Sequence, residues 1–156
     1  LIPPAGTSAK DRAEGFEEEI CKVFPNAHTE TFGKSSDRQD FMSTMEDVLS
    51  SHSSLDLVFG YSAQAGMGAY AALTTAGKEV YVYGVDGAPE AKKVIAKDNS
   101  IYRMTAAQSP ITIGKECYKA AKTLIAGEKP EEFEVDVPAF AIDSSNIDEY
   151  LDADWQ

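Results

Sequence analysis

The hydrophobic positions of this chain alternate between two kinds of pattern. Short apolar runs of strand length recur at residues 1–2, 27–32, 55–61, 80–85, 101–107 and 133–137. Between them, apolar residues repeat with the period of a helix, in segments 8–24, 41–49, 64–76, 89–98 and 110–126. Regular alternation of strands and helices is typical of α/β proteins. The pattern therefore predicts a doubly wound parallel sheet of five to six strands with helices on both faces.

Size and charge limit the kinds of partner. The chain has 156 residues, of which 43% are hydrophobic, enough for one globular domain with a core. Its formal net charge of -12 repels phosphate backbones, so we expect no nucleic-acid partner, although acidic surfaces also serve solubility alone. No apolar run reaches the roughly 20 residues that span a bilayer, so we expect no direct membrane insertion. The start at Leu1 has neither Met nor signal-peptide features, so we expect a piece of a longer protein.

Polar side chains gather where the predicted strands end. In open α/β sheets, ligands bind beyond the carboxyl ends of the strands. The loops there carry Thr7, Ser8 and Arg12; Ser35, Ser36, Asp37 and Arg38; Tyr61, Ser62 and Gln64; Asp86; and Gln108 and Ser109. This mixture of donors and acceptors suits a hydroxyl-rich ligand. Any single residue could instead cap a helix, Ser8 and Ser62 above all, so the prediction depends on the whole set.

Two motifs typical of enzymes fail on their context. Residues 60–64 (GYSAQ) resemble a nucleophile elbow, but the final glycine is missing and both His28 and His52 precede the serine. Residues 66–71 (GMGAYA) and Asp86 have the spacing of a dinucleotide fingerprint. They begin inside a predicted helix, however, where small residues favour close packing on the sheet. The histidines also lack metal-ligating neighbours. We therefore expect no enzyme activity, no cofactor and no metal.

Five stretches carry a resemblance to a known family. They are residues 6–16 (GTSAKDRAEGF), 56–59 (DLVF) with 76–78 (AGK), 82–90 (VYGVDGAPE), 106–110 (AAQSP) with Gly114, and 146–150 (NIDEY). In this order, the chain resembles the C-terminal part of ribose/galactose-type periplasmic binding proteins, the sugar-binding components of bacterial ABC importers. The resemblance covers nearly the whole chain. The combination of GTSA…RxxGF with GxDG…P is its most specific part.

The resemblance implies a ligand site with one residue from each strand-end loop. Arg12 would contact the ligand, Asp86 would accept hydrogen bonds from sugar hydroxyls, and Gln108 would contribute from the fifth loop. Ser62 stands where the family often has a ligand amide, and Ser36 stands where it often has an aromatic ring.

Departures from the family pattern bear on the ligand. Ser36, Ser62 and Val85 replace an aromatic, an amide and a Phe, and they imply a roomier, more polar pocket than a simple ribose-like ligand needs. Tyr61 is the alternative source of a ring.

The family has two lobes that grip the ligand between them, and this chain resembles one. We expect a C-terminal ligand-binding lobe over 1–138 and a hinge-crossing segment with an acidic tail over 139–156. The implied partners are a sugar-like small molecule, the missing N-terminal lobe and the permease of an ABC transporter. The implied location is extracytoplasmic, in the periplasm or lipid-anchored at the cell surface. Trp155, in the tail, needs a surface on which to pack.

Two features leave alternatives open. In the sheet order 2-1-3-4-5 the first and last helices share a face, so we expect Cys21 and Cys117 to lie near one another, either as a disulfide or as two buried thiols. The effector-binding core of a lactose-repressor-type transcriptional regulator shares the fold and is the alternative function. The acidic charge and the GxDGAPE stretch favour the importer component.

Overall fold

The computed structural model describes residues 1, 7–33, 37–130, 132 and 134–156. Its elements are, in chain order, α1 (Thr7–Val23), α2 (Arg38–Ser51), β1 (Leu57–Phe59), α3 (Ala63–Thr75), β2 (Tyr81–Asp86), α4 (Pro89–Ile95), β3 (Tyr102–Ala107), α5 (Pro110–Ile125), β4 (Phe140–Asp143) and the 3₁₀ turn η1 (Ile147–Glu149). The strands form one sheet in the order β1-β2-β3-β4. The predicted α/β class is confirmed.

Within the described residues the sheet is mixed and has four strands, fewer than the five to six that the pattern predicts. β1, β2 and β3 pair in parallel, while β4 runs antiparallel to β3 with Phe140 opposite Ala107. Residues 27–32 form no strand. Residues 27–31 are exposed, and only Phe32 and the adjacent Gly33 are half-buried, so this segment does not enter the sheet. The strand expected at 133–137 is also absent from residues 134–137, and the chain joins the sheet only at Phe140. Leu1 exchanges backbone hydrogen bonds with Phe59 and Tyr61, as a parallel neighbour of β1 would.

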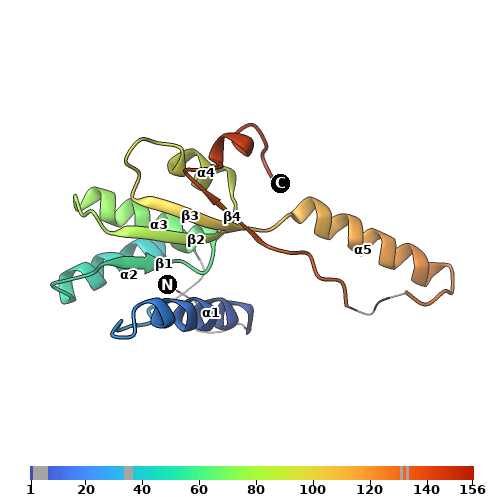
Figure 1. Ribbon diagram of the computed structural model, residues 1–156, viewed down its shortest axis with the longest axis horizontal. Coiled ribbons are helices and arrows are strands. Elements are labelled where there is room, and N and C mark those ends of the chain that lie inside the picture. The colour runs from blue at the N-terminus through green and yellow to red at the C-terminus, as the bar shows by residue number, and fades with distance from the viewer. Residues whose placement is uncertain (2–6, 34–36, 131, 133) are drawn as a thin grey trace.

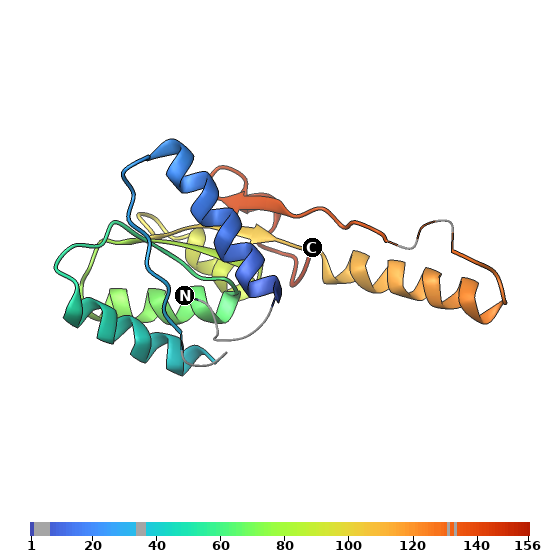
Figure 2. The ribbon, with the colours of Figure 1, turned by 90° about the horizontal axis from the view of Figure 1, so that it is seen from below.

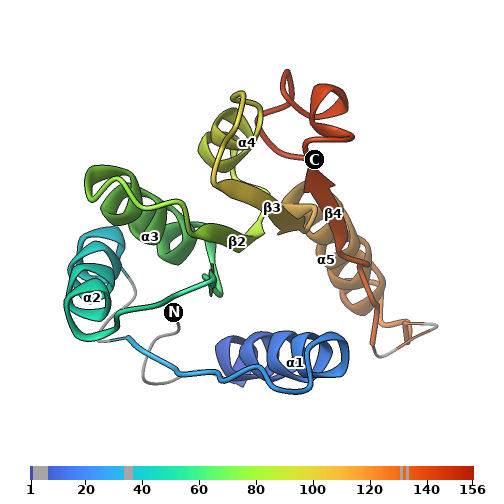
Figure 3. The same ribbon diagram turned by 60° about the vertical axis from the view of Figure 1, so that its left-hand side comes forward.

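Helices lie on both faces of the sheet, as predicted. α3 and α4 cover one face with α2 packed outside α3, and α1 lies across the other (Figures 1 and 3). On the α1 side, the ring of Phe16 stacks on Phe59 with 4.5 Å between centroids. The buried core lies on the α3 side and includes Met45, Val58, Leu73, Val82, Val94, Tyr102, Ile142 and Ile147.

The small residues of α3 serve packing. A Cβ atom on Gly66 would lie 2.4 Å from the hydroxyl oxygen of Tyr102, which is fully buried beneath the helix. The missing side chain therefore allows the helix to approach β3 closely. This contact explains the small residues within 66–71 as close packing on the sheet, the interpretation that the sequence favours.

The last long helix, α5, extends away from the rest of the molecule (Figures 1 and 2). None of its residues is buried. Ile113, Cys117, Ala121 and Leu124 repeat every three or four positions along it, and this apolar face of α5 is exposed. The helix therefore carries the pattern of a packed element without a partner in the described part of the chain.

The position of α5 overturns the expected neighbourhood of the two cysteines. Both are free thiols, Cys21 half-buried and Cys117 exposed. Cys21 lies in the last turn of α1, and that end of α1 points away from α5 (Figure 2). The prediction that they lie near one another is wrong, because α5 does not return to the face of the sheet that α1 covers.

None of the helices in the described ranges combines the length and apolar character that crossing a membrane requires.

Candidate ligand-binding site

Asp86 is the centre of the site at the carboxyl ends of the strands. It is the last residue of β2, and its Oδ1 accepts hydrogen bonds from Arg12 Nη1 at 3.4 Å and Gln108 Nε2 at 3.1 Å. Its Oδ2 accepts one from the backbone N–H of Ala63 at 3.0 Å, in the first turn of α3. Three of the five predicted site residues are therefore brought into direct contact, from α1, β2 and the end of β3.

The contacts of Asp86 suit a carboxylate. The Arg12 and Asp86 side chains are 29% and 22% exposed, so their ion pair is partly shielded from water. The N-terminus of α3 adds the positive end of a helix dipole. From the described part of the chain the carboxylate of Asp86 accepts three hydrogen bonds, and a carboxylate offers about four positions. Asp86 thus keeps capacity to accept a hydrogen bond from a ligand hydroxyl.

The backbone turns sharply at Asp86 and Gly87. Both residues have positive φ, 88° and 73°, and the first is uncommon for a residue with a side chain. The N–H of Gly87 donates to the buried hydroxyl of Thr105 at 3.1 Å, which holds the turn. A Cβ atom on Gly87 would lie 2.7 Å from the Cβ of Ala107. The Asp-Gly pair is therefore required locally, because it turns the chain beside β3 and presents the carboxylate at the edge.

The other two predicted residues have different outcomes. Ser62 is the N-cap of α3, and its Oγ accepts a hydrogen bond from the N–H of Ala65 at 3.3 Å. This is the capping role that the sequence also allows for Ser62, and a ligand contact by Ser62 stays a prediction. Ser36 lies outside the described residues.

Tyr61 and Arg38 are both engaged elsewhere. The ring of Tyr61, the alternative source of an aromatic platform, packs near Phe41 with 6.0 Å between centroids. Arg38 donates to Gln64 Oε1 at 3.1 Å and pairs with Glu90, which ties together the starts of α2, α3 and α4. These residues therefore support the edge beside Asp86.

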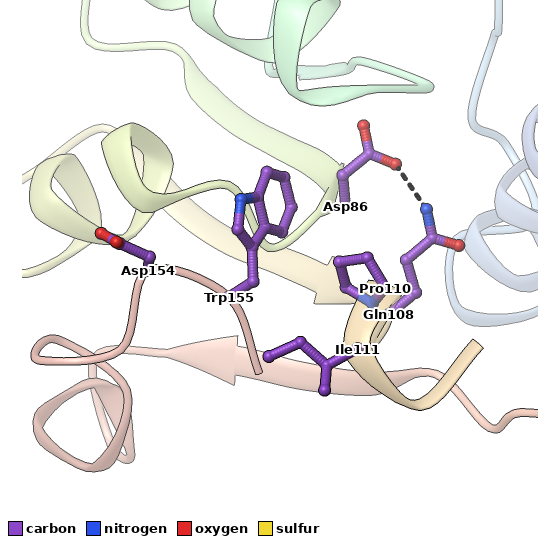
Figure 4. Close-up of a pocket in the computed structure, with 6 residues that line it drawn as sticks. All are labelled: Asp86, Gln108, Pro110, Ile111, Asp154 and Trp155. Carbon is purple, nitrogen blue, oxygen red and sulfur yellow. Dashed lines mark hydrogen bonds between the residues drawn. The ribbon is translucent and has the colours of Figure 1, made fainter. Parts of the chain in front are cut away.

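A pocket of about 730 Å³ opens at Asp86 and Gln108 (Figure 4). Its wall also includes Pro110 and Ile111 at the start of α5, together with Asp154 and Trp155 near the end of the chain. Sequence reasoning missed these four residues as site residues. The available signal was a single Trp at the end of a polar tail, which shows that a packing surface is needed but not which one.

Among the described residues, no cluster of three or more His, Cys, Asp or Glu side chains could hold a metal ion.

The fold and this strand-end site define a class of protein, and comparison with known proteins identifies the family. Residues 3–129 match the family model described as a periplasmic binding protein domain. The match covers more than half of the chain, so the chain belongs to the periplasmic binding protein family. The resemblance predicted from the motifs is confirmed.

Individual relatives show the same kinship. The ribose import binding protein of Salmonella typhimurium is 35% identical over 131 residues, which are 80% of this chain and 42% of that protein. An ABC transporter solute binding protein from Bacillus halodurans with bound myo-inositol superposes with a TM-score of 0.85 at 25% identity, over 97% of this chain and 52% of that one. A Mycobacterium smegmatis counterpart with bound glycerol gives a TM-score of 0.79 at 32% identity, over 92% and 49%. The chain thus spans about half the length of these relatives.

Proposed function

We propose that this chain is one lobe of the solute-binding component of an ABC importer, and that it binds a sugar or polyol at Asp86. The observation that carries the proposal is the contact of Asp86 with Arg12 and Gln108 at the mouth of a pocket of about 730 Å³. A carboxylate flanked by a guanidinium and an amide matches the alternating donors and acceptors of vicinal hydroxyl groups.

The ligand class draws support from the relatives. One is named for ribose import, and two solved structures hold myo-inositol and glycerol. All three ligands are neutral and carry several hydroxyl groups, which suits the polar side chains at the edge of the sheet.

The second lobe is the partner proposed for α5. The chain leaves the body at Pro110, returns at Phe140, and carries between them a helix with the exposed apolar face of α5. We assign that face to the missing lobe, because an amphipathic helix gains stability by burying its apolar side. On this proposal the chain crosses the hinge twice, once before α5 and once after it. The first crossing lies within the range expected for the ligand-binding lobe, 1–138. The second lies near the start of the segment expected from 139.

The family context bears on the remaining expectations. Periplasmic binding proteins are extracytoplasmic transport components without enzyme activity, which supports an extracytoplasmic location, a permease partner and a binding role here. The relatives described above are import binding proteins and give the transcriptional-regulator alternative no support.

Calorimetric titration of the two-lobed protein with D-ribose, myo-inositol and glycerol tests the proposal. We expect saturable binding of at least one of them and a matching rise in melting temperature. Asp86→Ala should abolish binding. Asp86→Asn, which tolerates the positive φ, should weaken it at least about 10-fold by loss of a charged acceptor. Asp98→Ala removes an exposed carboxylate from the loop that leads into β3, at the amino end of that strand, and is the matched control. Unchanged affinity in Asp86→Asn would contradict the proposal.

A further inference from the structure

We propose that Trp155 forms the apolar wall against which a ring-shaped ligand lies, and that Lys92 and Gln156 hold it there. The inference rests on the proposed function and adds the residue that distinguishes cyclic ligands from open-chain ones.

The pocket places Trp155 opposite the polar edge. Trp155 is the aromatic residue among its described lining residues, and its indole faces the space beside Asp86 and Pro110 (Figure 4). It is 40% exposed, although it is the largest apolar side chain of the protein. Binding sites for small molecules combine a few polar groups with apolar and aromatic walls. A sugar ring with hydroxyls at Asp86 turns a face of C–H groups outward, and an indole is a flat partner for such a face.

Hydrogen bonds fix the chain on both sides of Trp155. Lys92 Nζ, from α4, donates to the carbonyl oxygen of Ala153 at 2.6 Å and to Gln156 Oε1 at 3.4 Å. Gln156 Nε2 donates to the carbonyl oxygens of Gln108 at 2.9 Å and Asp86 at 3.4 Å. The segment 153–156 is therefore attached directly to the two strand ends that carry the polar side of the site.

The buried side chain of Lys92 depends on the attachment of segment 153–156 for its hydrogen bonds. Its side chain is 1% exposed, and a buried ammonium group is costly unless it is hydrogen-bonded. In the described part of the chain, the hydrogen bonds of Lys92 Nζ go only to Ala153 and Gln156. Burial lowers the pKa of Lys92, and nearby Asp154 opposes that shift. The segment 153–156 thus supplies the partners that make the buried charge acceptable.

Gly87 contributes the space for Gln156. A Cβ atom on Gly87 would lie 2.3 Å from Gln156 Nε2, so the amide rests directly on the glycine of the Asp-Gly turn. The same turn presents Asp86 at the edge. Gln156 therefore links the position of Trp155 to the position of the Asp86 carboxylate, which is proposed to bind the ligand.

Ligand discrimination in the two-lobed protein tests the inference. We expect Trp155→Ala to weaken myo-inositol and D-ribose about 10-fold in calorimetric titration, and glycerol by less than about 3-fold, because glycerol has no ring. Trp155→Phe should retain most of the affinity. Equal binding of the cyclic ligands by Trp155→Ala and the parent would overturn the inference and leave the proposed function standing. If the parent binds none of the three, the proposed function fails and the inference fails with it.

A double-mutant cycle tests the positioning role of Gln156. If Gln156 acts by holding Trp155, Gln156→Ala weakens the cyclic ligands in the parent but adds little loss to Trp155→Ala. Additive losses would overturn that role. Circular dichroism of each variant confirms that the fold is retained.

Discussion

The sheet edge around Asp86 and the helix α5 are adjacent in the chain, but they differ in whether their side chains find partners within it. Asp86 finds its partners within the chain, in Arg12, Ala63 and Gln108. α5 begins two residues after Gln108, has a clear apolar face, and buries none of it. On the proposed function, this stretch of chain forms half of a binding site at Asp86, while the exposed apolar face of α5 would be stabilised by the second lobe.

Two leucines give this comparison its largest expected effect. Leu73 is fully buried in α3, whereas Leu124 on α5 is 60% exposed. Leu73→Ala should lower the free energy of unfolding of this chain by about 2–5 kcal/mol, because it leaves a cavity. Leu124→Ala should change it by less than about 0.5 kcal/mol. Denaturant unfolding measures both.

The same pair sharpens the assignment of α5 to a second lobe. In the two-lobed protein, Leu124→Ala should become destabilising, while the effect of Leu73→Ala stays large. If Leu124→Ala remains neutral there, the apolar face of α5 does not pack on the other lobe.

Two glycines offer a smaller contrast between the regions. Gly87 and Gly127 have similar φ values, 73° and 78°. A Cβ atom would meet Ala107 and Gln156 at Gly87, but nothing within 4 Å at Gly127, just after α5. Both alanine variants carry the strain of positive φ, about 1–2 kcal/mol. Gly87→Ala should cost more in thermal unfolding, because the turn must also shift. Equal losses of stability would show that the atoms around Gly87 can move aside for a methyl group at no cost in stability.

Lys92 gives the smallest effect, through pH. Burial lowers its pKa in the folded protein, so the unfolded chain binds more protons between the folded and the unfolded pKa values. The contribution of Lys92 to stability therefore rises as the pH increases through the folded pKa toward the ordinary value of about 10.4. The free energy of unfolding of the parent and of Lys92→Met can be measured by denaturant unfolding at a series of alkaline pH values. As the pH rises, the parent should gain stability relative to Lys92→Met. Lys122→Met, on exposed α5, controls for the loss of one positive charge.

Much of the body was predictable because its signals are local. Alternating runs and glycine-marked helix ends gave the α/β class, and strand-end logic brought Arg12, Asp86 and Gln108 together. The rest depends on distant contacts. The amphipathic period of 110–126 indicates an apolar face on α5 but says nothing of what covers that face. The antiparallel return at Phe140 and the placement of Trp155 likewise depend on tertiary contacts that no short window contains.

The segment that carries α5 is attached to the sheet at two neighbouring points, which limits how it can move. The chain departs just after Ala107 and comes back at Phe140, and these two residues are direct partners in the ladder between β3 and β4. A body held at two neighbouring points can rotate about the line that joins them, whereas other rotations strain at least one connection. If α5 belongs to the second lobe, as proposed, that lobe would swing about one axis beside Asp86 and would open and close over the pocket.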